Sequence, residues 1–171
     1  MIEKRLLDSR VWMVADLLGV EQTKVKRIVV RYFDNCREEL FAGKVVRILG
    51  FVTLTPNIIV DDFISTTAVY CKKVSIAESL PYYSVREIMR TYFDICKQEL
   101  MEGRTVDFRA LATLHPLLED DRVTNIRVSI SATLKDKLIM RNSGVTSARA
   151  SICKLLKSEL CRNTALEVSK L

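Results

Sequence analysis

Four basic side chains lie close together at the start of a predicted long helix: Lys24, Lys26, Arg27 and Arg31. Cations at this spacing could bind the phosphates of a nucleic acid or the carboxylates of an acidic protein partner. The same pattern is also typical of a solvent-exposed helix face with no binding role. These residues are the candidate site for phosphate or acidic-partner contacts, and the sequence leaves both interpretations open.

Residues suited to catalysis or metal binding are sparse. His115 is the single histidine, and a lone histidine without ligands at metal spacing is a poor metal site. The chain has no phosphate-binding loop of the G-x-x-x-x-G-K-[ST] type. The acid pairs Asp61–Asp62 and Asp120–Asp121 are interpreted as solvated loop charges. We therefore expect a protein that is not an enzyme, with no catalytic residue, metal, cofactor or small-molecule substrate.

The cysteines and the apolar runs indicate a soluble intracellular protein. The longest uncharged run, residues 48–60, is too short for a membrane helix, which needs about 20 apolar residues. The charged N-terminus does not resemble a signal peptide. The number of cysteines is odd and none has C-x-x-C spacing, so we expect small buried side chains in a reducing compartment. They are Cys36, Cys71, Cys96, Cys153 and Cys161.

The net charge of +6 is spread unevenly along the chain. Residues 1–56 carry +3, residues 57–116 carry −1 and residues 117–171 carry +4. No long basic run concentrates the positive charge. This distribution allows contact with nucleic acid without requiring it.

An internal repeat organises the chain. Residues 25–56 and 85–116 are identical at 13 of 32 positions, whereas chance gives roughly two. Each copy has apolar residues at the i, i+3, i+4, i+7 spacing of an amphipathic helix, and a glycine follows, Gly43 or Gly103. The segments after the glycines are rich in β-branched residues and end at Pro56 and Pro116, so they predict paired strands. We expect the two copies to superpose as one helix and two strands, with Tyr32, Phe33, Cys36 and Leu40 buried like Tyr92, Phe93, Cys96 and Leu100.

The remaining segments predict an α+β fold made of repeated units. Residues 65–74 and 123–134 are strand candidates, and shorter helices are expected at 72–79 and 134–142. A partial third copy continues the helical stripe and has a possible strand at 165–171. Its apolar residues are a candidate interface with another copy or partner: Val145, Ala148, Ile152, Leu156 and Leu160. The predicted units are residues 1–75, 76–134 and 135–171.

The order of these elements resembles the HU/IHF family of bacterial histone-like DNA-binding proteins, whose unit is a helical hairpin followed by a three-stranded sheet. The text "GKVVRILGFVTL" at 43–54 places Gly43, Gly50 and Phe51 at positions of the family's G-F-G-x-F sequence, although Val52 and Leu54 replace the later Gly and Phe. The second copy keeps Gly103 but reads "ALATL" at 110–114. The resemblance implies tandem, divergent HU/IHF-like units in a bacterial cytoplasm.

The family grips DNA with basic β-arms whose proline wedges between base steps. The corresponding segments here carry a net charge of −2 (57–70) and −1 (117–127), so they lack the cations that phosphate binding needs. One hypothesis is therefore a structural protein that assembles with copies of itself or other proteins, such as a ring or connector of a phage tail, incorporated into the virion. The alternative is a nucleoid-type protein that binds DNA weakly and without sequence specificity.

Overall fold

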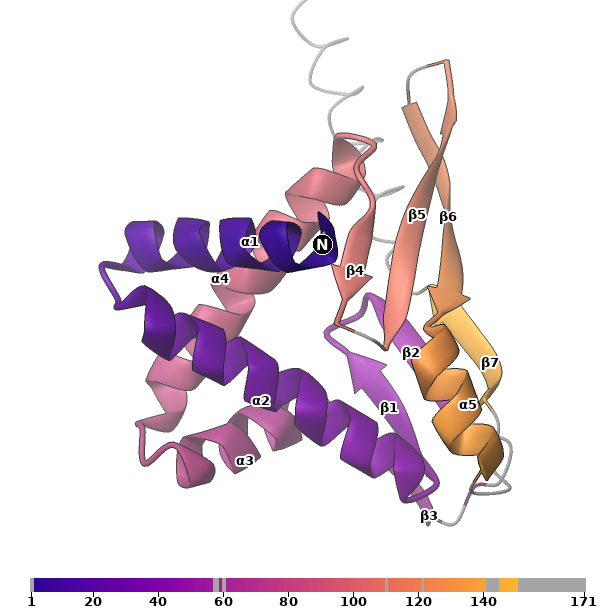
Figure 1. Cartoon of the computed structure of the whole chain (residues 1–171), viewed down its shortest axis with the longest axis horizontal. Coiled ribbons are helices and arrows are strands. Elements are labelled where there is room, and N and C mark those ends of the chain that lie inside the picture. The colour runs from indigo at the N-terminus through magenta and orange to yellow at the C-terminus, as the bar shows by residue number, and fades with distance from the viewer. Residues whose placement is uncertain are drawn as a thin grey trace, which may run out of the picture.

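The computed structural model has an α+β fold, with helices α1 to α4 on one side and most of the strands on the other (Figure 1). It describes residues 2–56, 59, 61–109, 111–120, 122–140 and 145–150. The elements are α1 (Ile2–Leu18), α2 (Gln22–Phe41), β1 (Lys44–Ile48), β2 (Val52–Pro56), β3 (Asp61–Ser65), α3 (Thr67–Ala77), α4 (Tyr82–Met101), β4 (Val106–Phe108), β5 (Ala112–Glu119), β6 (Arg122–Ile130), α5 (Ala132–Met140) and β7 (Val145–Ala150).

The two copies of the repeat form the same elements in the same register. Val46 lies opposite Leu54 in the β1–β2 pair, and their counterparts Val106 and Leu114 lie opposite each other in β4–β5. All eight aromatic, cysteine and leucine positions expected in the core are buried. The predicted helix and two strands of each copy are therefore confirmed.

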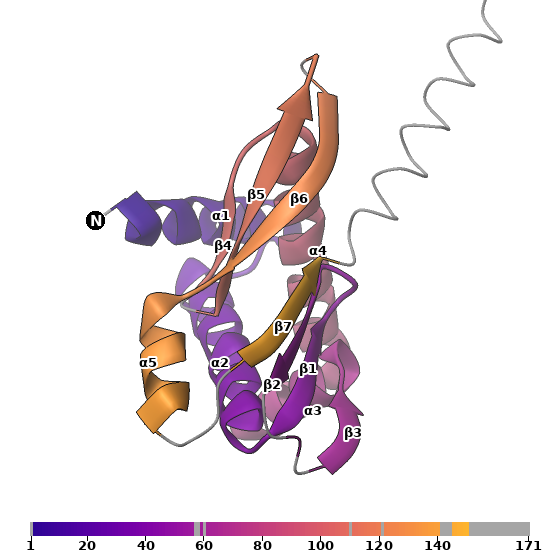
Figure 2. The same ribbon diagram turned by 90° about the vertical axis from the view of Figure 1, so that its right-hand side faces the viewer.

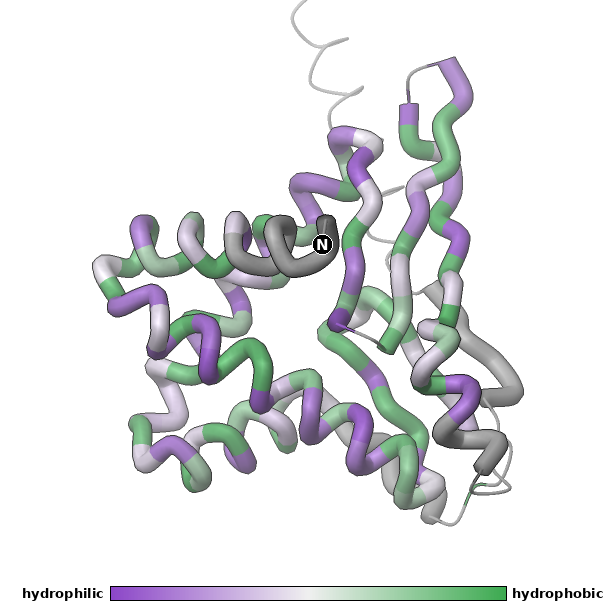
Figure 3. Tube along the Cα trace, in the orientation of Figure 1, coloured by the Kyte–Doolittle hydropathy of each residue, from purple (hydrophilic) through white to green (hydrophobic). Residues whose placement is uncertain are grey.

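Both long helices end in the same way. Gly43 and Gly103 each adopt φ 77°, a left-handed conformation that side chains disfavour. Their backbone N–H groups donate to the carbonyls of Leu40 and Leu100, both at 3.1 Å. Figure 3 shows apolar and polar residues alternating along α2 and α4, as expected for helices with one buried face. The glycines stop each helix where the chain must turn into its first strand.

The two units share one core because each short helix packs on the long helices of both units. Helix α1 packs on α2 of its own unit and also on α4, whereas α3 packs on α4 and also on α2. At the centre, the rings of Tyr32 and Phe93 are 5.6 Å apart and those of Phe33 and Tyr92 are 6.1 Å apart. Each pair is the repeat equivalent of the other. Edge-to-face pairs of this kind add about 0.5–1.5 kcal/mol beyond the burial of their area.

The strand predicted at residues 65–74 is wrong, because this segment forms most of α3. Its β-branched residues favour a strand locally, but Tyr70, Cys71 and Val74 are buried at helical spacing. The packing of α3 on α2 therefore outweighs local propensity. The unit boundary predicted between residues 75 and 76 falls within this helix. The helices expected at 72–79 and 134–142 correspond to α3 and α5, and the strand expected at 123–134 corresponds to β6.

The helical stripe predicted to begin at Val145 is also wrong, because residues 145–150 form strand β7. Strand β7 pairs with β2, and Ala148 lies opposite Leu54 just as Val128 of β6 lies opposite Leu114 of β5. Strand β2 needs a partner along its second edge, since unpaired backbone groups in a sheet are costly. The C-terminal segment thus supplies the third strand of the first unit (Figure 2). Ile152, Leu156, Leu160 and the strand considered at 165–171 lie outside the described residues.

Apart from β3, the two sheets have equivalent strands in the same order. One has the order β3-β1-β2-β7 and the other β4-β5-β6, so β1-β2-β7 corresponds to β4-β5-β6. Strand β3 is an addition that pairs in parallel with β1. All other strand pairs are antiparallel.

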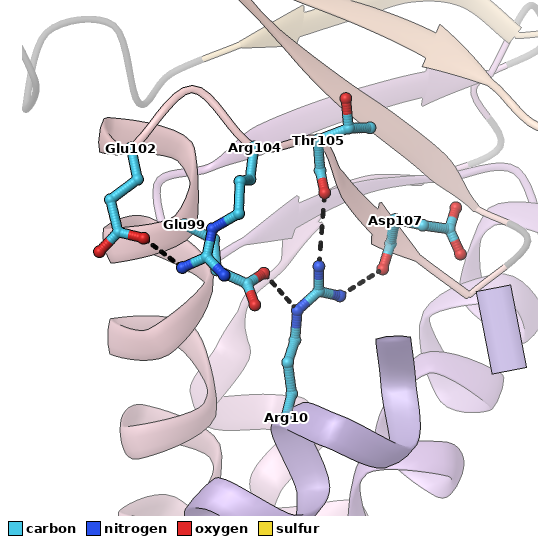
Figure 4. Close-up of polar contacts among 6 residues, drawn as sticks. All are labelled: Arg10, Glu99, Glu102, Arg104, Thr105 and Asp107. Carbon is cyan, nitrogen blue, oxygen red and sulfur yellow. Dashed lines mark hydrogen bonds and ion pairs between the residues drawn. The ribbon is translucent and has the colours of Figure 1, made fainter. Parts of the chain in front are cut away.

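A buried carboxylate near the end of each long helix binds a cation from the other unit. Arg10 of α1 is 1% exposed and its Nε lies 2.6 Å from Oε2 of Glu99 on α4. The same guanidinium donates to the backbone oxygens of Asp107 (3.4 Å) and Thr105 (3.5 Å), so it joins α1 to α4 and to the start of β4 (Figure 4). Glu39, the repeat equivalent of Glu99, pairs with Lys73 of α3. These ion pairs join α1 to α4 and α3 to α2, and so hold the two helical hairpins together.

Replacing Arg10 should destabilise the protein strongly. Arg10→Met leaves the Glu99 carboxylate buried without its partner, and such a change costs about 3–5 kcal/mol. Urea unfolding followed by circular dichroism measures the loss. Arg104→Met is a matched control, because Arg104 pairs with Glu102 on the exposed surface of the same corner (Figure 4) and should cost less than about 1 kcal/mol. Equal costs for the two variants would show that the buried pair does not hold α1 on α4.

Candidate interaction site

The basic cluster predicted on α2 is partly neutralised by the fold. The side chains of Arg27 and Arg31 both pair with Glu78, and Nε of Arg31 lies 2.6 Å from Oε1. Glu78 caps the C-terminus of α3, and its carboxylate is 6% exposed between two half-exposed arginines. Lys24 and Lys26 are half-buried on the first turns of α2. The structure therefore assigns two of the four candidate cations to an ion pair within the chain.

Helix α4 presents a pair of arginines that the sequence pattern did not single out. Arg86 and Arg90 are exposed and one helical turn apart, and neither forms an ion pair or hydrogen bond with a described residue. Both line a groove of about 470 Å³ between α3, α4 and the β1–β2 turn. The other lining residues are Leu49, Thr67, Ala68, Cys71, Tyr82 and Asp94. The groove thus combines apolar side chains with one carboxylate and with two cations that have no ion-pair partner among the described residues.

The repeat shows where the two long helices differ in charge. Arg27 and Arg31 of α2 correspond to Glu87 and Thr91 of α4. Arg86 and Arg90 correspond to Lys26 and Val30. Aligning the copies could have revealed this difference, because Arg86 and Arg90 stand four residues apart on the face that the apolar stripe leaves free. The neutralisation of Arg27 and Arg31 needs the packing of α3 on α2 and has no local signal.

The β5–β6 hairpin projects beyond the rest of the described chain (Figures 1 and 2). Glu119 and Asp120 at its tip are exposed and form no ion pair with a described residue. Leu117 and Leu118 beside them are 44% and 52% exposed. The tip is therefore an acidic and apolar surface, whereas DNA-gripping arms are basic.

Pro116 does not end its strand as predicted. It lies within β5, which continues to Glu119, and it faces Ile126 of β6. Strand β4 pairs with β5 only from Ala112 to Leu114, so β5 is an edge strand at Pro116 and the missing N–H is tolerated there. Pro56 is the last residue of β2, as predicted. Neither proline lies at the tip of the hairpin.

His115, the single histidine considered as a metal ligand, is a strand residue. It lies in β5 opposite Arg127. Within the described ranges, no cluster of three His, Cys, Asp or Glu side chains is placed to hold a metal ion. The described helices likewise include none with the length and apolar character needed to cross a membrane.

Three cysteines are buried free thiols with raised pKa values. Burial raises the pKa of Cys96 to about 12, against an ordinary value of 9.0. Burial raises the pKa of Cys71, which lines the groove, to about 11, and the nearby Arg86 opposes the shift. Burial also raises the pKa of Cys36 well above its ordinary value. These thiols are core side chains with little thiolate at neutral pH.

Comparisons with protein-family models, curated proteins and solved structures find no match to this chain.

The native protein should leave Cys36, Cys71 and Cys96 unmodified by iodoacetamide at pH 8, since alkylation requires an accessible thiolate. Mass spectrometry of peptides from native and urea-unfolded protein measures the reaction at each cysteine, and the unfolded sample is the control. We expect at least about a tenfold slower rate in the native state. Modification of these three cysteines at equal rates in both samples would contradict their burial.

Alkaline pH should destabilise the fold because the buried thiols must stay protonated. A thiol whose folded pKa exceeds its unfolded value binds its proton more tightly in the native state. The stability that it contributes is therefore complete below pH 9 and declines as the pH rises toward 11 and 12. Urea midpoints measured between pH 8 and pH 11 should fall, and Cys71→Ser, which removes the thiol in the groove, should weaken this decline. A midpoint that rises with pH over this interval would contradict the assignment.

Proposed function

We propose that this chain is a non-enzymatic structural protein with a duplicated, divergent HU/IHF-like fold, which assembles with copies of itself or with other proteins of a larger structure. The observation that carries the proposal is an acidic and partly apolar hairpin tip at the place where the family's arms are basic. In addition, two of the four candidate cations on α2 are neutralised by Glu78. A ring or connector of a phage tail is a home that the family resemblance favours.

The order of elements supports the HU/IHF resemblance. Each unit has a helical hairpin followed by three strands, which are β1-β2-β7 in the first unit and β4-β5-β6 in the second. The two helical hairpins pack against each other around one core, as those of two intertwined chains of the family do. One chain with this arrangement has two non-identical halves, so its surfaces can differ while its core stays symmetric.

The charges support assembly over DNA bending. The segment at the family's arm position is acidic at its tip, where Glu119 and Asp120 are exposed beside Arg122. In the first unit, β2 ends at Pro56 and no long hairpin continues β2 within the described residues. Phosphate contacts require cations at these places, and like charges repel.

The alternative is weak, sequence-independent DNA binding, which the net charge of +6 and the unpaired Arg86 and Arg90 favour. Binding through these side chains would rest on counterion release alone, so it would weaken steeply with salt. It would not bend the duplex, because neither proline lies at a hairpin tip.

A fluorescence titration on a short duplex at roughly 150 mM salt, together with a bending assay, separates the two functions. We expect no binding, or a Kd in the range of about 1–100 μM that is typical of non-specific contacts, with no bend. Any residual affinity should tighten in Glu78→Gln, which frees Arg27 and Arg31 of their acid partner. Glu38→Gln, the same change at an exposed site near the C-terminal end of α2, is the control. Nanomolar affinity with a sharp bend would overturn the proposal in favour of the nucleoid-type alternative.

A further inference from the structure

We infer that the acidic tip of the β5–β6 hairpin of one copy docks into the groove between α3 and α4 of a second copy. This inference rests on the proposed function and names the surfaces through which assembly occurs. It assigns a partner to two features of the described chain that the fold itself does not use. One is a protruding acidic hairpin, and the other is a groove with two unpaired arginines.

The hairpin tip has the chemistry of a docking segment. Glu119 and Asp120 carry exposed carboxylates without an ion-pair partner among the described residues. Leu117 and Leu118 add apolar area that is about half exposed. A Cβ added to Gly103 would meet Leu118 at 3.2 Å, so the hairpin is supported at this point by the end of α4. A supported tip loses less conformational entropy on binding than a free loop does.

The groove has the complementary chemistry. Arg86 and Arg90 can each bind a carboxylate in the bidentate manner that guanidinium groups favour. Leu49, Ala68 and Tyr82 provide apolar contacts for leucine side chains. Asp94 subtracts one charge and leaves a net charge of +1 among the lining side chains. The groove therefore suits a segment that carries both carboxylates and leucines.

The two surfaces lie at opposite ends of the molecule. Both views place the hairpin tip at the top, whereas α3 and the start of α4 lie toward the bottom (Figures 1 and 2). A hairpin therefore reaches the groove of another copy and leaves its own groove free. Contacts of this head-to-tail kind produce rings when the rotation closes and filaments when it does not.

A carboxylate partner fits the groove better than nucleic acid does. Asp94 and the exposed acid Glu87 on α4 would repel a phosphate backbone, which needs a continuous basic track. A hairpin tip meets the two arginines at a single place and avoids these acids. Its leucines also have apolar side chains to contact, whereas a phosphate backbone has no use for them.

Complementary charge reversal tests the docking directly. The groove variant is Arg86→Glu with Arg90→Glu, and the tip variant is Glu119→Arg with Asp120→Arg. Sedimentation velocity over a series of roughly 10–500 μM covers the range expected for a small interface. Wild-type protein should associate, and each variant alone should associate at least about tenfold more weakly, because its tip and groove carry like charges.

Mixing the two variants should restore association. The acidic tip of the groove variant then meets the basic groove of the tip variant, and the basic tip meets the acidic groove. The control is Arg127→Glu with Lys135→Glu, which makes the same charge change at exposed positions on β6 and α5, outside the groove lining and the hairpin tip, and should associate like wild type. Circular dichroism spectra that match wild type show that each variant is folded.

The remaining outcomes each contradict the docking. If wild-type protein associates but the mixture of variants does not, assembly uses another surface and the proposed structural function survives. If the wild type stays monomeric while the groove variant alone loses affinity for duplex DNA, the arginines bind phosphate. If the control variant weakens association as much as the groove variant does, the effect is one of net charge.

Discussion

The fold depends on the packing of the two helical hairpins against each other. Long helices α2 and α4 each present a buried aromatic pair, and each pair is completed by the pair on the other helix, Tyr32 with Phe93 and Phe33 with Tyr92. The buried carboxylate of Glu99 pairs with Arg10 of α1, and that of Glu39 pairs with Lys73 of α3 as well as with Lys44 of its own unit. Separating the halves would leave Glu99 without Arg10 and would expose the aromatic rings, and both are costly. The two sheets and the surfaces they carry are positioned by this shared core.

Duplication in one chain allows the two halves to differ where the core does not constrain them. The central aromatic, cysteine and leucine positions keep their residue types, whereas positions outside the core diverge, as Arg27 against Glu87 and Val30 against Arg90 show. The arginines of α2 pair with Glu78, and Arg86 and Arg90 of α4 have no ion-pair partner among the described residues. Likewise, one unit extends its strands into a hairpin and the other closes its sheet with β7. A symmetric dimer of identical chains could not separate these roles.

The sequence predicted the parts of the fold that depend on local pattern. The stripe from Val25 to Leu40, the glycine after it and the β-branched run beyond predicted a helix and two strands, because these signals agree with one another. Residues 145–150 were assigned wrongly because Val145 and Ala148 fit a helical stripe as well as a strand. The open edge of β2, 90 residues earlier, decides between them. That edge exists only in the folded chain.

The candidate site was predicted less well, for a similar reason. The basic residues of α2 form a clear cluster in sequence. The acid that neutralises two of them lies at the end of α3 and meets them only when α3 packs on α2. Arg10 carried no signal either, since an arginine in a helix is ordinarily solvated. Its burial against Glu99 depends on α1 crossing onto α4. Interactions between distant segments therefore set the surface charge and the buried ion pairs.

Native-state hydrogen exchange tests the shared core most directly. If α2 and α4 form one core, the amides at Tyr32 and Phe33 and those at Tyr92 and Phe93 should exchange only through global unfolding, with opening free energies equal within about 1 kcal/mol. The dependence of these free energies on urea should also match that of global unfolding. Two sets of values that differ by more than about 2 kcal/mol would show that the halves unfold separately, and would contradict an intertwined pair of units.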